Sequence, residues 1–318
     1  MSRDITFLDN LNVDNKKLIS RLISKVEENN SEHDEILSAI HKNTGNAYRI
    51  GITGPPGAGK SSITNQLVKL IVSKNKSVGI IAVDPTSPFS GGALLGDRVR
   101  MSEVGGMPGV YIRSMATRGS LGGLSHKTID AADVLDAAGF DFVIFETVGV
   151  GQSELDIAQA ADTTFVVLVP ESGDAIQAMK AGLMEIADFF VMNKCDRPGF
   201  ESAISALRTI LMFKDHDENS WLPEIIKAVA TENKGITEIF ENIEKHRNYL
   251  DKHDLLIKNR KARSLNRIKD IVKDRINFEL SDFYNQEKFL NAINEVVTGS
   301  LSPYQLAEQI LKVYKDKK

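Results

Sequence analysis

The chain has 318 residues, of which 42% are hydrophobic and 26% charged, and its formal net charge is −4. This balance is ordinary for a globular protein, and it gives no electrostatic reason to expect nucleic acid or an acidic membrane as a partner. No apolar stretch approaches the ~20 residues that span a bilayer, and a single cysteine excludes a disulfide framework within the chain. We therefore expect a cytoplasmic protein.

The sequence pattern predicts three parts. Residues 1–45 carry two short helical patterns, and we expect this prefix to pack on the core rather than to form a domain. Residues 46–250 alternate apolar runs with helical segments and form the expected main domain. Residues 251–318 hold no strand pattern, and an apolar stripe at helical spacing, with Leu265 and Ile268, predicts a helical arm. Such an arm after a complete domain favours oligomerisation over packing within one chain.

The main domain is predicted to have an α/β fold. Its candidate strands are the apolar runs at 48–53, 78–84, 109–115, 140–147, 163–170, 189–194 and 225–231. These runs are apolar throughout rather than at every second residue, which indicates a mainly parallel central sheet flanked by helices on both faces. In sheets of this kind, ligands bind beyond the carboxyl ends of the strands, and the motifs described below follow those ends.

Residues 54–61 read GPPGAGKS and fit the pattern GxxxxGK[ST] of a P-loop, between a candidate strand and a helical pattern. Glycines let successive backbone N–H groups turn towards phosphate oxygens. Lys60 supplies positive charge for the outer phosphates, and the Ser61 hydroxyl is placed to ligate magnesium. An incidental lysine in a Gly-Pro-rich turn explains this context less well. The expected nucleotide contacts are Gly54, Pro55, Pro56, Gly57, Ala58, Gly59, Lys60, Ser61 and Ser62.

An NKxD motif, here NKCD, follows the candidate strand at 189–194. The Asp196 carboxylate can accept hydrogen bonds from N1–H and the exocyclic amine of guanine, which adenine cannot offer. Asn193 and Lys194 are expected to brace the loop and flank the base. After a P-loop, this motif favours GTP over ATP as the bound nucleotide. A second base contact is predicted at Ala230 and Thr231.

Carboxylates at strand ends are the candidate magnesium ligands. Asp84 ends one candidate strand and Glu146 ends another, and either could instead cap a following turn. In a P-loop protein, two such carboxylates more often serve the metal or the attacking water. Asp97 lies in a glycine-rich loop between them and is a third candidate. With Ser61, the predicted magnesium site comprises these four residues.

Glu146 also begins an ExxG motif, at the place where many P-loop GTPases have DxxG. Gly149 can present its backbone N–H to the γ-phosphate and sense its loss on hydrolysis. No glutamine follows directly to orient the attacking water, since Gln152 comes three positions later. We therefore expect slow intrinsic turnover that a partner stimulates.

Three segments closely resemble the MeaB/ArgK-type GTPases: VDPTSPFSGGALLGDRVRM at 83–101, TRGSLGGLS at 117–125 and DAAGFDFVIFETVGVGQSE at 136–154. The likeness covers essentially the whole chain. It implies a SIMIBI-type P-loop fold that binds GTP or GDP with Mg²⁺ and forms homodimers through the helical carboxyl-terminal arm. It also implies a chaperone of an adenosylcobalamin-dependent acyl-CoA mutase, most often methylmalonyl-CoA mutase, which stimulates GTP hydrolysis and whose cofactor loading the GTPase gates.

The resemblance also assigns candidate catalytic residues. Lys60 and Glu146 belong to the phosphate and metal site, and the segment GDAIQAMK, ending at Lys180, matches a switch segment that couples the mutase to hydrolysis. Gln177 and Lys180 are then candidates for completing the site when the mutase docks, with Lys180 acting like an arginine finger. Glu171 precedes this segment and departs from the usual family pattern.

Two other functions compete with this interpretation. A GTP-dependent metallochaperone of the same fold class usually carries His-rich tracts or CxxC sites, whereas the six histidines here are scattered and cysteine occurs once. A small-molecule kinase has no use for guanine selection, so the NKCD motif disfavours it.

Overall fold

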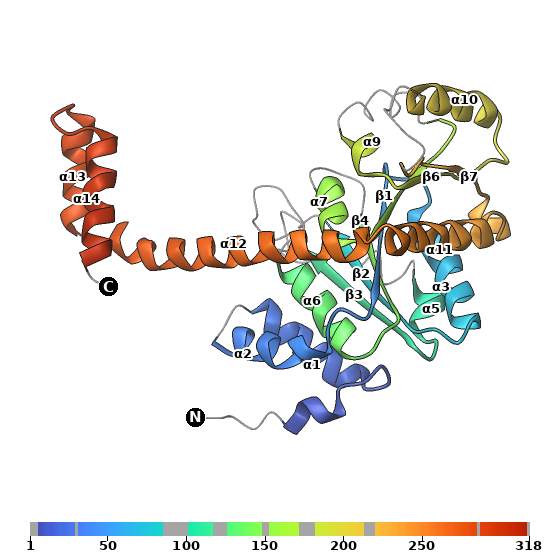
Figure 1. Cartoon of the computed structure of the whole chain (residues 1–318), viewed down its shortest axis with the longest axis horizontal. Helices are drawn as coiled ribbons and strands as arrows, with labels where there is room; N and C mark the ends of the chain where they lie inside the picture. The colour runs from blue at the N-terminus through green and yellow to red at the C-terminus, as the bar shows by residue number, and fades with distance from the viewer. Residues whose placement is uncertain are drawn as a thin grey trace. The chain divides into compact units, whose positions relative to one another are not determined.

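The computed structural model describes residues 6–28, 31–84, 101–116, 126–147, 153–171, 182–212, 220–284 and 287–316. The chain divides into two compact units, Met1–Ile257 and Lys258–Lys318. Figure 1 shows the first unit as a sheet between layers of helices and the second as helices alone. None of the described helices is long and apolar enough to cross a membrane.

The first unit is built on a seven-stranded sheet in the order β3-β2-β4-β1-β5-β6-β7, with every neighbouring pair parallel. The strands are β1 Tyr48–Thr53, β2 Val78–Asp84, β3 Val110–Ala116, β4 Phe142–Thr147, β5 Thr163–Leu168, β6 Phe189–Met192 and β7 Ile225–Lys227. The predicted mainly parallel sheet is confirmed. The predicted strand ends at 170, 194 and 231 are too late by two to four residues, because the chain there already turns into loops beyond the sheet.

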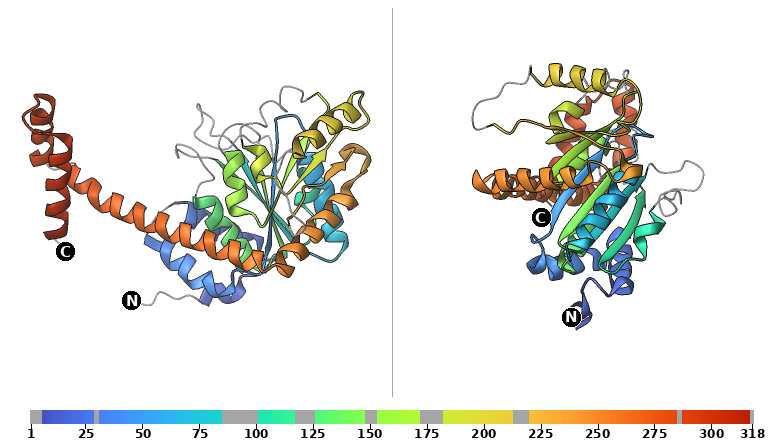
Figure 2. Two further views of the ribbon diagram at one scale, coloured as in Figure 1. Left: turned by 45° about the horizontal axis from the view of Figure 1, so that its top comes forward. Right: turned by 90° about the vertical axis from the view of Figure 1, so that its right-hand side faces the viewer.

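Helices cover both faces of the sheet (Figure 2). One face packs on α3 Lys60–Ser73, α5 Ser102–Gly105 and α11 Ile236–Lys252. The other face packs on α1 Lys16–Glu27, α2 Ser31–Ile40, α6 His126–Ala137 and α7 Ser153–Ala160, with α9 Leu183–Ile186 and α10 Phe200–Leu211 beside β5 and β6. Short 3-10 turns occur at η1 Thr6–Asn10, η2 His41–Asn43 and η4 Ala230–Glu232. Because both faces are buried, the strands are apolar throughout.

The prefix packs on the main core. Ile19, Leu22, Ile23 and Val26 of α1 are at most 1% exposed and join the hydrophobic cluster of α6. The helix begins at an N-cap, where Asn15 accepts a hydrogen bond from the backbone N–H of the third helical residue. Burial of this one apolar stripe ties the prefix to the sheet.

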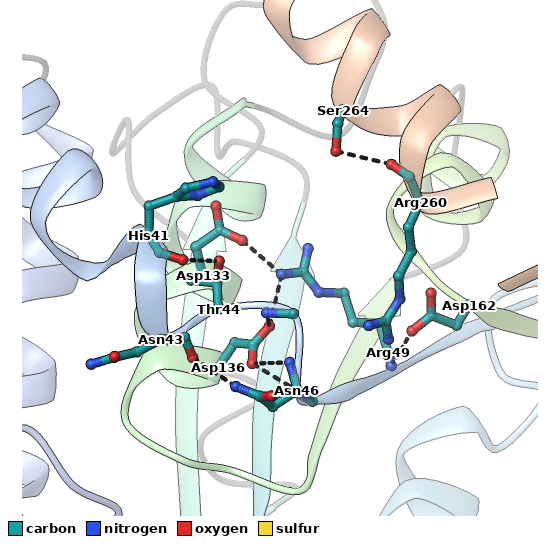
Figure 3. A network of polar contacts seen from close by, with 12 residues as sticks. His41, Asn43, Thr44, Asn46, Arg49, Asp133, Asp136, Asp162, Arg260 and Ser264 are labelled. Carbon is teal, nitrogen blue, oxygen red and sulfur yellow. Dashed lines mark hydrogen bonds and ion pairs between the residues drawn. The ribbon is translucent and has the colours of Figure 1, made fainter. Parts of the chain in front are cut away.

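A buried polar cluster fixes the junction between the prefix and β1 (Figure 3). The Asp136 carboxylate accepts hydrogen bonds from the backbone N–H groups of residues 45–47 at 2.8 to 3.0 Å. The Arg49 guanidinium donates to Asp133 at 2.6 Å, and its backbone N–H donates to Asp162 at 3.0 Å. Burial opposes the charge of Arg49, yet the neighbouring Asp133 carboxylate raises the pKa of Arg49 above its ordinary value. Opposite charges therefore compensate one another at this junction.

His246 of α11 is a second buried polar group, 3% exposed. Its Nδ1 lies 2.8 Å from Oγ1 of Thr163, which is hydrogen-bonded to the Tyr48 hydroxyl at 2.6 Å. The Trp221 ring packs 4.8 Å from the imidazole. Burial lowers the pKa of His246 to about 4, although Asp188 lies 3.4 Å from Nε2. The imidazole is therefore neutral near pH 7.

We expect this buried histidine to make the unit acid-sensitive. Between pH 6.5 and 4 the unfolded state binds a proton that folded His246 does not, so the free energy of unfolding falls as the pH is lowered, by on the order of 3 kcal/mol. Urea unfolding at several pH values measures this dependence. In His246→Gln the pH dependence through this window should be shallower. Equal slopes for the two proteins would contradict the assignment.

The second unit is entirely helical in its described residues. It consists of α12 Leu255–Tyr284, which begins in the first unit, α13 Glu287–Val297 and α14 Pro303–Asp316. The predicted capping box is confirmed: the Ser302 N–H donates to Gln305 Oε1 at 2.9 Å and the Gln305 N–H donates to Ser302 Oγ at 3.2 Å. Leu280, Phe289 and Ile310 form its small core.

Candidate functional site

The P-loop is the turn between β1 and α3, and two of its glycines are required by close contacts. Gly54 has φ +136°, and a Cβ there would lie 2.1 Å from the backbone oxygen of Val167. Gly59 has φ +90°, and a Cβ there would lie 2.3 Å from Nδ2 of Asn193. A side chain at either position would therefore clash as well as strain the backbone. The loop is held against β5 at one end and against the NKCD loop at the other.

Lys60 begins α3 and is 6% exposed. Its Nζ donates hydrogen bonds to the backbone oxygens of Gly54 at 2.7 Å and Pro55 at 3.0 Å. The ammonium group thus lies within the curve of the loop, at the helix N-terminus, where the backbone N–H groups and the helix dipole also attract anions. Positive charge and N–H donors converge on one place, which is the chemistry needed to hold phosphate.

Ser61 and Glu146 meet beside the loop. The Ser61 hydroxyl donates to Oε1 of Glu146 at 2.6 Å, and Glu146 is 5% exposed at the end of β4. Asp84 ends β2, which is hydrogen-bonded to β4, so its backbone lies at the same edge of the sheet. Hydroxyl and carboxylate oxygens are the hard ligands that Mg²⁺ takes in proteins, and this donor set fits that ion.

Several predicted site residues lie beyond what the structure describes. Asp97, Gly149, Gln177 and Lys180 fall outside the described residues, as does the side chain of Asp84. Within the described part of the chain, no group of three His, Cys, Asp or Glu side chains is placed to hold a metal ion. The Ser61–Glu146 pair is therefore the described portion of the predicted magnesium site.

The NKCD loop is tied to the P-loop by two side chains. Asn193 is 3% exposed, donates from Nδ2 to the backbone oxygen of Ala58 at 2.8 Å, and accepts at Oδ1 from the Ala230 N–H at 3.1 Å. Lys194 has φ +59° and donates from Nζ to the backbone oxygen of Gly57 at 2.8 Å. Asn193 thus connects three segments that are far apart in the sequence.

The other residues predicted to contact the base, and Cys195 of the NKCD motif, differ in their exposure to solvent. Asp196 and Thr231 are exposed, whereas Ala230 is buried. The Cys195 thiol donates to the backbone oxygen of Met192 at 3.1 Å, and burial raises its pKa. The exposed Asp196 carboxylate can therefore accept hydrogen bonds from a base. The Cys195 thiol is protonated and contributes to packing.

One cavity of about 530 Å³ contains the phosphate-binding groups. It is lined by Pro56, Gly57, Gly59, Lys60, Ser61, Ser62, Asn65, Glu146, Thr147 and Lys194. Asp196, Ala230 and Thr231 do not line it, so the base-binding residues lie beyond its edge. Two lining residues, Asn65 and Thr147, were not among the site residues predicted from the sequence. Asn65 follows Ser61 by one helical turn and shares its helix face, a spacing that could have revealed it.

Comparison with known proteins finds a matching family model and several relatives of similar length. A model of the family described as Methylmalonyl Co-A mutase-associated GTPase MeaB matches residues 19–283. A candidate GTPase of Pyrococcus abyssi is 46% identical over 299 residues, covering 93% of this chain and 92% of the relative. GTPase ArgK of Escherichia coli is 33% identical over 317 residues, covering 94% of each chain.

A mouse relative and a solved structure extend this similarity. Methylmalonic aciduria type A homolog, mitochondrial, from Mus musculus is 31% identical over 278 residues, covering 85% of this chain and 66% of the relative. The crystal structure of a LAO/AO transport system kinase matches with a TM-score of 0.72 at 25% identity, covering 97% of this chain and 96% of the other. Sequence and fold are therefore shared over nearly the full length.

Proposed function

The chain belongs to the MeaB family of GTPases, and from this premise we propose that it is a GTP-hydrolysing chaperone of an adenosylcobalamin-dependent acyl-CoA mutase. GTP hydrolysis is the activity of the family. The proposal adds that the nucleotide state gates cofactor loading and protects or reactivates the mutase. Methylmalonyl-CoA mutase is the favoured partner, and the cytoplasm the favoured location.

The observation that carries the proposal is the family match over residues 19–283, whose description names association with methylmalonyl-CoA mutase. The match includes the nucleotide site and most of α12, so it is not confined to the P-loop that many nucleotidases share. The Mus musculus relative is named for methylmalonic aciduria, and this name supports a partner that acts on a methylmalonyl compound.

We assign the nucleotide contacts as the sequence predicted them. Lys60 and the N–H groups of the loop bind the phosphates, and the Asp196 carboxylate accepts from guanine. Magnesium, when bound, neutralises charge that develops on the phosphate oxygens, and Ser61 and Glu146 with Asp84 and Asp97 would hold it. The 2.6 Å hydrogen bond between Ser61 and Glu146 keeps these two oxygens together at the edge of the cavity.

We also propose that the arm, residues 251–318, forms the homodimer. Three apolar side chains of α12 at helical spacing are about half exposed: Leu265 at 53%, Ile268 at 58% and Val272 at 49%. An apolar stripe of this kind on a long helix is typical of a surface that a second helix covers.

A metallochaperone role has less support, since no metal-binding group of three side chains occurs among the described residues.

The proposal is tested by measuring GTP hydrolysis with and without the methylmalonyl-CoA mutase of the same organism, with ATP as the control nucleotide. We expect the mutase to stimulate GTP hydrolysis at least about tenfold and to leave ATP hydrolysis unaffected. Lys180→Ala should lose this stimulation, while Lys245→Ala, which removes an exposed lysine of α11, should keep it. GTP hydrolysis that the mutase does not change would overturn the chaperone proposal and leave the GTPase assignment standing.

A further inference from the structure

A buried pair of threonines joins two strand ends at the nucleotide site. Thr53 ends β1 and Thr147 ends β4, and both side chains are 0% exposed. The Thr147 hydroxyl donates to Oγ1 of Thr53 at 3.0 Å. The two strands are parallel neighbours with Ile52 opposite Glu146, so the threonines occupy the next step of the same register. Neither residue was singled out by the sequence motifs.

The two motifs that begin at these strand ends are the ones that the sequence predicts to contact the phosphates. Thr53 directly precedes Gly54, the first residue of the P-loop. Thr147 lies within the ExxG motif, two residues before Gly149, the predicted contact for the γ-phosphate. The hydroxyl bond therefore links the start of the phosphate loop to the start of the predicted γ-phosphate segment.

Other contacts hold the P-loop on the β5 side and within the loop itself, whereas the threonine pair joins it to β4. On the β5 side, Gly54 lies so close to the backbone oxygen of Val167 that no Cβ fits. Within the loop, Lys60 holds the backbone oxygen of Gly54. On the β4 side, the Thr147 hydroxyl donates to Thr53 and the Ser61 hydroxyl donates to Glu146. Successive residues of a strand point to opposite faces, so Glu146 and Thr147 hold the loop from two sides.

We propose that Thr147, acting through Thr53, is a positioning residue for GTP hydrolysis. The bond sets the separation between the first residue of the P-loop and the end of β4, and thereby the alignment of the γ-phosphate with the groups that act on it. Because the pair is excluded from water, its hydrogen bond is directional and has no solvent competitor. Misplacing reacting groups by about 1 Å can lower a rate by about 100-fold, whereas diphosphate binding relies on the loop and Lys60.

The test compares Thr53→Val, Thr147→Val and the double variant, since valine has nearly the shape of threonine without the hydroxyl. Each single variant leaves one buried hydroxyl without its partner, so it should unfold at lower urea than the unmodified protein. The double variant removes both hydroxyls and should regain most of that stability. It thus separates loss of the link from loss of folding.

We expect the double variant to hydrolyse GTP about tenfold more slowly in single turnover without any mutase, while its affinity for a fluorescent GDP analogue stays within about twofold. Thr147→Ser should recover most of the rate. Thr209→Val, which removes a threonine hydroxyl on α10 that does not line the cavity, is the matched control. A double variant with the unmodified rate would overturn the proposal, as would a parallel loss of GDP affinity. The inference rests on GTP hydrolysis alone and is independent of the mutase.

Discussion

Lys60→Ala is expected to lower the rate of GTP hydrolysis by about 10³-fold or more, because it removes the ammonium group that the P-loop holds at its own backbone oxygens. Charge builds up on the phosphate oxygens as the terminal bond breaks, and a fixed ammonium group stabilises that charge without reorganisation. Lys60 is 6% exposed and already held by two backbone oxygens of the loop, so little has to move when phosphate arrives.

Single-turnover hydrolysis with protein in excess over GTP measures the effect of this substitution. Lys69→Ala is the matched control, because Lys69 lies on the same helix but forms a surface ion pair with Glu103 at 2.7 Å. Lys60→Arg should not restore the rate, since a planar guanidinium with a fixed fork of donors cannot reproduce the compact ammonium charge that Gly54 and Pro55 hold. Hydrolysis by Lys60→Ala at the rate of the Lys69 control would show that the charge comes from another residue.

Asp196→Asn is expected to change the base that the site selects. A carboxylate accepts from both N1–H and the 2-amino group of guanine, whereas an asparagine amide presents one acceptor and one donor. The donor then faces the 2-amino group of guanine and suits the 2-oxo group of xanthine. We expect affinity for GDP to fall about 100-fold and affinity for XDP to rise, because a site built for hydrogen bonds rejects a mismatched partner strongly.

Competition of GDP and XDP against a fluorescent nucleotide gives both affinities in one experiment. Asp251→Asn, an exposed acid on α11, is the control for loss of one negative charge. The substituted side chain is exposed and makes none of the bracing contacts of Asn193, so the fold should be retained. Unchanged preference for GDP would mean that Asp196 does not read the base.

The amino-acid sequence by itself determined that the main domain has a mainly parallel sheet, and the order in which strands and helices follow one another along the chain. Each strand carries its own apolar run, and each P-loop or NKCD residue belongs to a short motif whose chemistry is local. The capping box at Ser302 and Gln305 is likewise local, and the structure has both of its hydrogen bonds. Such features need no knowledge of distant residues, because neighbouring side chains and backbone groups satisfy one another.

Only the tertiary structure decided which distant residues meet. Asn193 contacts Ala58 across 135 positions of the sequence, and Thr147 contacts Thr53 across 94. Parallel strands bring together ends that are separated by whole helices, so their partners depend on strand order, which periodicity does not reveal. A buried threonine in an apolar run reads as packing until a second hydroxyl is found opposite it. The strand order β2-β4-β1-β5 supplies that partner and, with it, the link between the two motifs that are predicted to contact the phosphates.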